Sequence, residues 1–156
     1  MTSISACPVT DANSEELFNW RNDAHTRAMS HSSEPVEWAD HVRWFEATLE
    51  DPDRCLLMCR LDGGNENVAM VRFDVDGATA LISINIAPTM RGKGLAGPCL
   101  QTAIRFFHLA YRDVNLIKAE IKAVNPASRK AFEGAGFTLA GKAGKAGEDW
   151  LYTKPV

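Results

Sequence analysis

Short apolar runs alternate with polar turns along this chain, and between them apolar residues recur at helical spacing. The apolar runs predict strands over residues 3–9, 54–61, 68–74, 80–86, 116–124, 137–140 and 150–153. Spacings of three and four residues predict helices over residues 14–26, from Trp38 to before Asp51, from Gly97 past Phe107, and from Pro126 to before Gly136. We therefore expect a mixed α/β architecture.

Two turn sequences join the middle strands into an antiparallel meander. Asp62-Gly63-Gly64-Asn65 lies between the second and third predicted strands, and Asp74-Val75-Asp76-Gly77 lies before the fourth. Both have the composition of hairpin turns. The strand at 80–86 then reaches the strand at 116–124 through a helix, which predicts one β-α-β crossover with those two strands parallel.

The predicted helices carry boundary signals and apolar faces. Asn13 followed by Glu16 resembles a capping box for the first helix, and Pro98 lies in the first turn of the third, where a missing N–H costs nothing. The stripe predicted for the second helix is Trp38, Val42, Phe45 and Leu49, with His41, Trp44 and Thr48 beside it. The apolar face predicted for the third helix is Leu100, Ala103, Ile104 and Phe107.

Length and charge bound the function classes. With 156 residues, the chain is predicted to form one domain, 1–156, around a single core. A formal net charge of −3 offers no basic footprint for nucleic acid or for an anionic membrane. The apolar runs are shorter than the roughly 18 residues of a membrane span. The N-terminus lacks a basic segment followed by an apolar core, so we expect a cytoplasmic location.

Two other features resemble sites but lack the required residues. The four cysteines form no C-x-x-C pair and have no histidine at metal-ligand spacing, so no metal site is predicted. Residues 136–143 match the G-x-x-x-x-G-K pattern of a P-loop, but Ala143 replaces the Ser or Thr that would bind magnesium, and a helix precedes the motif where a strand is required. We interpret this segment as a hairpin loop.

The stretch from Ile82 to Gly97 carries the clearest chemical signal. A strand-like run breaks at Pro88, passes through Gly92 and Gly94, and enters a helix. Glycines allow successive backbone N–H groups to approach one anion, and the first helical turn adds its unpaired amides and its positive dipole end. The pattern predicts a phosphate site.

Two kinds of ligand fit that site. The three glycines match the G-x-G-x-x-G spacing of a dinucleotide fingerprint, which normally follows the first strand of its domain and precedes an acidic residue about 20 positions later. Here the motif lies past the middle of the chain, and Asp113 comes before the next predicted strand. The same residues read Arg91-Gly92-Lys93-Gly94-Leu95-Ala96, which resembles the Arg/Gln-x-x-Gly-x-Gly/Ala signature of the GNAT superfamily of acetyl-CoA-dependent N-acetyltransferases. The position in the chain favours the GNAT interpretation, with a purely structural strand-to-helix turn as the alternative.

Two further segments extend this resemblance along the chain. Asn125-Pro126-Ala127-Ser128, with Phe132 and Gly136-Phe137, is similar to the GNAT helix that follows the fifth strand. Trp20-Arg21-Asn22 and His41-x-x-Trp44-Phe45 are similar to a subset that acetylates nucleotide-linked amino sugars and, less closely, to ribosomal-protein N-terminal acetyltransferases. The implied structure is an α+β GNAT fold with a mixed sheet of about six or seven strands, about four helices, and fourth and fifth strands that splay apart.

The resemblance implies acetyl-CoA as the acyl-donor co-substrate. Its pantetheine arm would pair with backbone groups of residues 84–86, as an amide chain can at an open sheet edge. Its pyrophosphate would bind the amides of residues 91–97, with added charge from Arg91 and Lys93 unless these side chains are only solvated. The implied cofactor contacts are Ile84, Asn85, Ile86, Arg91, Gly92, Lys93, Gly94, Leu95, Ala96, Gly97, Asn125 and Phe132.

The implied reaction is attack of a neutral amine on the thioester, helped by proximity and by acid–base catalysis. Many members use a tyrosine near the leaving thiolate, at the position where this chain has Phe132. Ser128, one turn earlier, is then the candidate thiolate partner, with a local hydrogen bond in the first helical turn as its structural alternative. Asp74 and His41 are the candidate bases, with a turn residue, a packed histidine and a water-mediated path as alternatives.

The predicted acceptor is a small-molecule amine or a peptide N-terminus. The candidate acceptor residues offer aromatic faces and cationic donors that suit a sugar ring and a diphosphate, unless the tryptophans belong to the core. They are Trp20, Arg21, Asn22, His41 and Trp44. A peptide N-terminus would instead use acidic groups such as Glu34 and Glu37. A non-catalytic acetyl-CoA-binding module is the alternative function, and the resemblance allows a homodimer.

Overall fold

The computed structural model describes residues 3–30, 32–63 and 66–156. In these residues a seven-stranded sheet has the order β1-β2-β3-β4-β5-β7-β6. Its strands are β1 (Ile4–Pro8), β2 (Arg54–Leu61), β3 (Asn67–Asp76), β4 (Thr79–Ile86), β5 (Leu116–Ile121), β6 (Thr138–Ala143) and β7 (Asp149–Pro155). Strands β4 and β5 are parallel and the other neighbours are antiparallel. The meander and the single crossover predicted from the sequence are confirmed.

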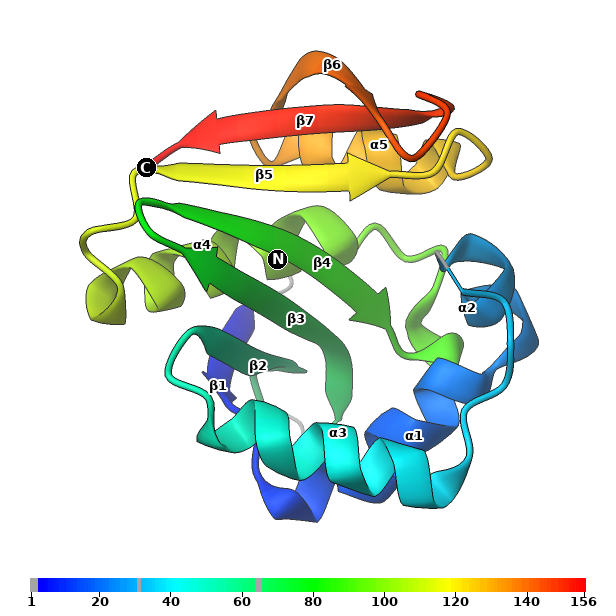
Figure 1. Ribbon diagram of the computed structural model, residues 1–156. Helices are drawn as coiled ribbons and strands as arrows, with labels where there is room; N and C mark the ends of the chain where they lie inside the picture. Colours follow the sequence, from blue (N-terminus) through cyan, green and yellow to red (C-terminus); the bar gives the residue numbers. More distant parts are fainter. Residues whose placement is uncertain (1–2, 31, 64–65) are drawn as a thin grey trace.

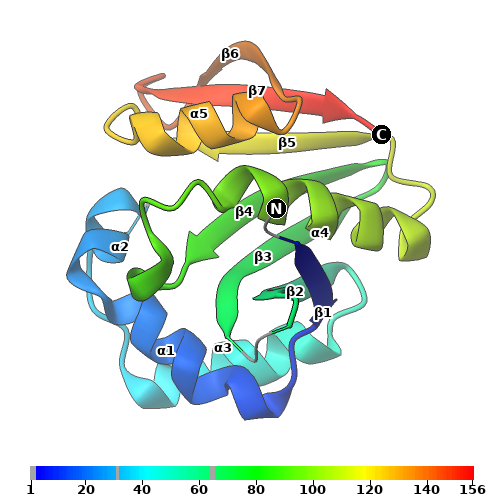
Figure 2. The ribbon, with the colours of Figure 1, turned by 180° about the vertical axis from the view of Figure 1, so that it is seen from behind.

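Helices lie on both sides of the sheet. They are α1 (Ser14–Asn22), α2 (Ala24–Met29), α3 (Trp38–Glu50), α4 (Ala96–Ala110) and α5 (Pro126–Gly134), with short 3₁₀ helices η1 (Asp11–Asn13) and η2 (Pro88–Met90). Figure 2 shows α4 and α5 covering one face of the sheet, with α4 in front of β1 to β4 and α5 in front of β5 and β7. In Figure 1, α1, α2 and α3 lie along the lower and right-hand side of the molecule.

A large part of the core lies between the sheet and α4. The four residues of the predicted apolar face of this helix, at positions 100, 103, 104 and 107, are all buried. The Phe107 ring stacks on Phe73 of β3, with the ring centroids 4.0 Å apart, and on Tyr111 at 4.6 Å. This packing fixes α4 against β3, and therefore fixes the first turn of α4 beside the end of β4.

The prediction of one continuous first helix is wrong, because the helix breaks at Asp23. Asp23 has an extended backbone conformation (φ −58°, ψ 134°), and its carboxylate accepts a hydrogen bond from the Thr26 N–H at 3.1 Å. The chain therefore ends α1 at Asn22 and starts a new capped helix, α2. The predicted Asn13–Glu16 capping box is also wrong, because the Asn13 side chain accepts instead from the Thr10 N–H at 3.0 Å.

The second helix turns a different face to the core than its apolar pattern predicts. His41, Phe45 and Thr48 are its buried residues, whereas Trp38 is 47% exposed. The polar pair can be buried because each side chain has a nearby hydrogen-bond partner: Thr48 Oγ1 donates to the Trp44 carbonyl oxygen at 2.7 Å, and His41 contacts Ser14.

Two strand boundaries also differ from the sequence prediction. The strand predicted over 116–124 ends at Ile121, and the segment interpreted as a hairpin loop at 136–143 mostly forms β6, which pairs with β7. Pairing with a neighbouring strand thus outweighs the weak strand propensity of a Gly-, Lys- and Ala-rich sequence. Gly64 and Asn65 of the first predicted turn lie outside the described residues.

The cysteines are free thiols, and two of them pack in the core. The Cys59 thiol donates to the Cys99 carbonyl oxygen at 3.7 Å, and burial raises the pKa of the Cys55 thiol to about 11. Within residues 3–30, 32–63 and 66–156, no three His, Cys, Asp or Glu side chains are grouped to hold a metal ion. Within the same residues, no helix has both the length and the apolar character needed to cross a bilayer.

Candidate active site

The parallel pair β4–β5 is only partly formed. Strand β4 pairs with β3 along its whole length, but with β5 only over Thr79–Leu81, opposite Leu116–Lys118. Beyond Leu81 the two strands diverge, and Figure 1 shows the gap widening toward their carboxyl ends. We call the space between residues 82–86 and 119–121 the wedge. Strand edges that face such a space present backbone N–H and C=O groups to an extended ligand.

A turn rich in glycine lies directly after the end of β4. Gly92 (φ +73°) and Gly94 (φ +71°) adopt left-handed conformations, and a β-carbon built on either would meet nothing within 4 Å. Both glycines therefore face open space. Helix α4 begins at Ala96 without a side-chain cap from Leu95. Residues 91–97, which we call the glycine turn, thus combine exposed backbone with an uncapped helix N-terminus, an arrangement that binds anions.

A single cavity of about 960 Å³ connects the wedge, the glycine turn and the first three helices. Its size falls within the range of small-molecule sites. Basic side chains outnumber acidic ones in its lining, although the whole chain has a formal charge of −3. The basic residues are Arg21, Arg27, Arg72, Arg91, Lys122 and Lys130, and the acidic residues are Glu34 and Glu120. The cavity therefore suits an anionic ligand.

Two arginines contact one tryptophan at the end of the cavity formed by α1 and α3. The guanidinium carbon of Arg21 lies 4.9 Å from the centroid of the Trp44 ring, and that of Arg72 lies 5.4 Å from it. Desolvation lowers the pKa of Arg21, and the nearby positive charge of Arg72 lowers it further. Arg72 also donates to Asp74, whereas no ion pair of Arg21 is present in the described residues. This unbalanced, partly buried charge favours a bound anion.

His41 is 1% exposed and lies among aromatic rings. Its Nε2 lies 3.0 Å from the Ser14 carbonyl oxygen, so we assign the proton to Nε2, which donates to that oxygen. Nδ1 is buried and has no hydrogen-bond partner in the described residues. Burial lowers the pKa of His41 and Arg21 lowers it further, against the opposing hydrogen bond to Ser14. The ring is therefore neutral near pH 7, with a free lone pair on Nδ1.

The start of α5 forms another part of the cavity wall. The Asn125 side chain accepts from the Ser128 N–H at 3.1 Å and caps the helix, which begins at Pro126 as the sequence predicts. Ser128 and Phe132 line the cavity one turn apart. Phe132 also packs edge-on against Phe137, with ring centroids 5.0 Å apart, and is 2% exposed. The only hydroxyl on this turn of the wall is that of Ser128.

A comparison with family models supplies the decisive observation. The model described as "Acetyltransferase (GNAT) domain" matches residues 7–138, most of the chain. The chain belongs to this family.

Solved structures agree with the GNAT fold. The structure is similar to a domain from Methanocaldococcus jannaschii DSM 2661, with a TM-score of 0.84 and 22% identity over 100% of both chains. It is similar to spermidine N-acetyltransferase from Vibrio cholerae in complex with CoA and spermine, with a TM-score of 0.85 and 16% identity over 98% of this chain and 95% of that one. It is also similar to AAC(6')-Ib in complex with ribostamycin and coenzyme A, with a TM-score of 0.80 and 19% identity over 97% and 92% of the two chains. A search of curated proteins found no match.

Most of the residues predicted for the GNAT site line the one cavity. On the cofactor side these are Ile84, Asn85, Ile86, Arg91, Gly92, Gly94, Leu95, Ala96, Gly97, Asn125 and Phe132, and the others are Arg21, His41, Trp44 and Ser128. Four predicted residues lie outside its lining: Trp20, Asn22, Asp74 and Lys93. Trp20 is buried in the core, Lys93 is exposed, and the Asn22 amide both donates to and accepts from the Val36 backbone at 2.8 Å.

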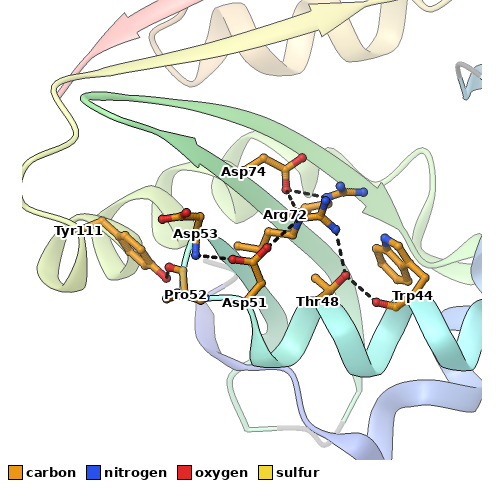
Figure 3. A network of polar contacts seen from close by, with 9 residues as sticks. Trp44, Thr48, Asp51, Pro52, Asp53, Arg72, Asp74 and Tyr111 are labelled. Carbon is orange, nitrogen blue, oxygen red and sulfur yellow. Dashed lines mark hydrogen bonds and ion pairs between the residues drawn. The ribbon is translucent and has the colours of Figure 1, made fainter.

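Asp74, a predicted base, takes part in a polar network beside α3 (Figure 3). Its Oδ1 accepts from Arg72 Nε at 2.9 Å and lies 4.0 Å from Arg54 Nε. Arg54 in turn contacts Thr48 and Asp51. In this position Asp74 holds Arg72 beside Trp44, and it does not line the cavity.

Several cavity residues were missed by the sequence analysis. Arg72 is one, although a single arginine within the apolar run of β3 is a signal that could have found it. Thr26 and Lys122 are others: Arg91 donates to Thr26 and to Asp23, which lies outside the lining, and Lys122 donates to the Ser30 carbonyl oxygen. Only the tertiary structure brings these partners together.

Replacing Gly94 by valine tests whether the glycine turn binds phosphates. The new side chain would enter open space in the cavity at a left-handed φ, so we expect coenzyme A affinity to fall about tenfold by calorimetry, from lost anion contacts and backbone strain. Gly77→Val is the matched control, because Gly77 has φ +61° and equally open surroundings in the β3–β4 turn. Equal affinities of the two variants would place the phosphates elsewhere.

Proposed function

We propose that this GNAT protein transfers the acetyl group of acetyl-CoA to a primary amine by direct attack in a ternary complex. The observation that carries the proposal is the continuity of one cavity from the glycine turn, through the wedge, to the two arginines at Trp44. A donor with a pyrophosphate and an amide-rich arm fits the first two parts, and an acceptor fits the third. The protein acts in this proposal as an acyltransferase that holds both substrates in line.

Acetyl-CoA occupies the glycine turn and the wedge in this proposal. The pyrophosphate binds the backbone amides of residues 91–97, and the pantetheine amides pair with the free edge of Ile84, Asn85 and Ile86. Coenzyme A is present in the solved structures of spermidine N-acetyltransferase and AAC(6')-Ib, which share the fold. Asn125 and Phe132 lie on the α5 side of the same cavity, where the thioester end of the arm would pass.

The chemistry needs a neutral amine, a polarised thioester and a stabilised leaving group. The amine nitrogen forms a bond to the acetyl carbon, the carbon–sulfur bond breaks, and coenzyme A leaves as a thiolate that takes up a proton. We assign Ser128 to the departing sulfur, because its hydroxyl lines the cavity at the turn where Phe132 offers none.

The proton from the amine has three candidate destinations. His41 borders the cavity, which makes it the better placed of the two predicted bases. Asp74 is less well placed, because its carboxylate is bound by Arg72 outside the cavity lining. Water in the cavity is the other candidate, as the sequence analysis left open.

The charge of the acceptor end favours a nucleotide-linked 4-amino sugar. Spermine and aminoglycosides, the ligands of the similar structures, are polycations, which the Arg21 and Arg72 guanidiniums would repel. A diphosphate would pair with these guanidiniums, and a sugar or base ring could pack on Trp44. A peptide or ribosomal-protein N-terminus is the second candidate acceptor, and Glu34 in the cavity lining is the observation in its favour.

An activity screen separates these proposals. We expect thiol release from acetyl-CoA with UDP-4-amino sugars and not with spermidine, aminoglycosides or short peptides. Arg21→Gln should raise the acceptor KM about tenfold and leave the acetyl-CoA KM within about twofold, because one charged contact is lost at the acceptor end. Arg43→Gln, an exposed arginine on α3, is the control variant.

Three results would revise this view. Turnover of peptides alone would replace the acceptor and keep the transferase. Coenzyme A binding without turnover of any amine in the screen would favour the non-catalytic acetyl-CoA-binding module. Failure to bind coenzyme A would reject the cofactor assignment.

The Ser128 assignment makes a kinetic prediction. Ser128→Ala should lower kcat about tenfold with little change in the acetyl-CoA KM, because the interaction strengthens as charge develops on sulfur. Ser128→Thr retains a hydroxyl and should recover much of the activity. An unaltered kcat in an alanine variant limited by chemistry would leave Ser128 with a role in helix α5 only.

A further inference from the structure

Helix α2 bridges the two sides of the wedge. At its first turn, the Arg91 guanidinium from the glycine turn donates to the Asp23 carboxylate, and to Thr26 Oγ1 at 2.7 Å. At its last turn, the Lys122 ammonium, directly after β5, donates to the Ser30 and Ala28 carbonyl oxygens at 3.0 and 3.4 Å. Figure 1 shows α2 at the open end of the gap between β4 and β5. The strands that separate at Leu81 are thus reconnected through this helix.

The Arg91 guanidinium is only partly used by these bonds. One terminal nitrogen, Nη2, makes the contacts to both Asp23 and Thr26. Within the described residues, Nε and Nη1 make no hydrogen bond, and the side chain lines the cavity beside Gly92 and Gly94. A guanidinium has five donors in a rigid plane, so holding one end of the plane fixes the direction of the other donors.

Asp23 is well suited to hold that plane. Its carboxylate accepts from both Arg91 and the Thr26 N–H, so it binds the cation and caps α2 at once. The hydrogen bond from Arg91, followed by that from Thr26, lowers the pKa of Asp23, which is therefore ionised at neutral pH. The side chains of this ion pair are only 29% and 26% exposed, unlike the Asp40–Arg43 pair on the outer face of α3, at 60% and 74%.

We propose that Asp23 is a positioning residue that aims Arg91 at the pyrophosphate of acetyl-CoA and thereby couples the donor site to α2, which forms part of the acceptor wall. This inference rests on the proposed function. The free Nε and Nη1 donors take the phosphate oxygens while Nη2 stays on Asp23 and Thr26. Filling the glycine turn then restrains Arg91, and through it the wall that carries His25, Thr26, Arg27 and Met29. The acceptor site is completed after the coenzyme binds.

A double-mutant cycle tests the positioning role. Asn in place of Asp23 retains a helix cap but removes the charge that holds Arg91. We expect Asp23→Asn and Arg91→Ala each to lower coenzyme A affinity about tenfold by calorimetry, and the double variant to bind no more weakly than Arg91→Ala. Asp40→Asn is the matched control, because it removes an exposed Asp–Arg pair whose residues do not line the cavity, and it should bind like the wild type.

Limited proteolysis measures the coupling between the donor site and α2 separately from the binding affinity. Arg27 is the trypsin site within α2, and coenzyme A should slow cleavage there about fivefold or more in the wild type and in Asp40→Asn. The Asp23→Asn variant should not show this protection, even at a coenzyme A concentration that saturates the variant. Thermal unfolding of each variant checks that the fold is intact.

Three outcomes would overturn the inference. Asp23→Asn binding coenzyme A as well as the wild type would show that Arg91 needs no positioning, and tighter binding would show that Asp23 competes with the phosphates. Additive losses in the double variant would show that the two residues act independently. A wild-type protein that does not bind coenzyme A would instead reject the proposed function itself.

Discussion

The short parallel pairing between β4 and β5 is the constraint on which the rest of the site depends. Each strand has a full antiparallel partner on its other side, β3 for β4 and β7 for β5, so the sheet stays intact when they separate. The separation leaves strand edges facing a cavity, where water or a ligand can satisfy them. The glycine turn begins a few residues beyond the end of β4, so the distance between the wedge and the anion site is fixed.

Charge within the cavity complements this backbone arrangement. The chain is acidic overall, yet basic side chains from α1, β3, the glycine turn and the end of β5 meet around one space. Two of them, Arg91 and Lys122, also hold α2, so the residues that would attract an anionic ligand also set the shape of the acceptor wall. Trp44 and Asp74 hold Arg72 in a comparable way at the other end.

The sequence predicts the parts of the site that local patterns encode. The glycine turn, the apolar face of α4 and the Asn125 cap each follow from spacing within a few residues. The break at Asp23 could not be predicted this way, because it depends on a capping hydrogen bond that competes with a continuous helix and on a partner 68 residues away. Trp20 and Asn22 do not line the cavity as predicted, for a related reason. Adjacent residues on a helix point to different sides, so only Arg21 of Trp20-Arg21-Asn22 reaches the cavity.

Hydrogen exchange at the wedge tests the central claim most directly. Backbone amides of residues 83–86 should exchange about tenfold more slowly when the protein is saturated with coenzyme A, because the pantetheine amides extend the sheet at that edge. Saturation with 3′-phospho-ADP, which has the phosphates and no pantetheine, should leave exchange at these residues unchanged while slowing it at the glycine turn. Equal exchange at residues 83–86 with and without bound coenzyme A would contradict the account.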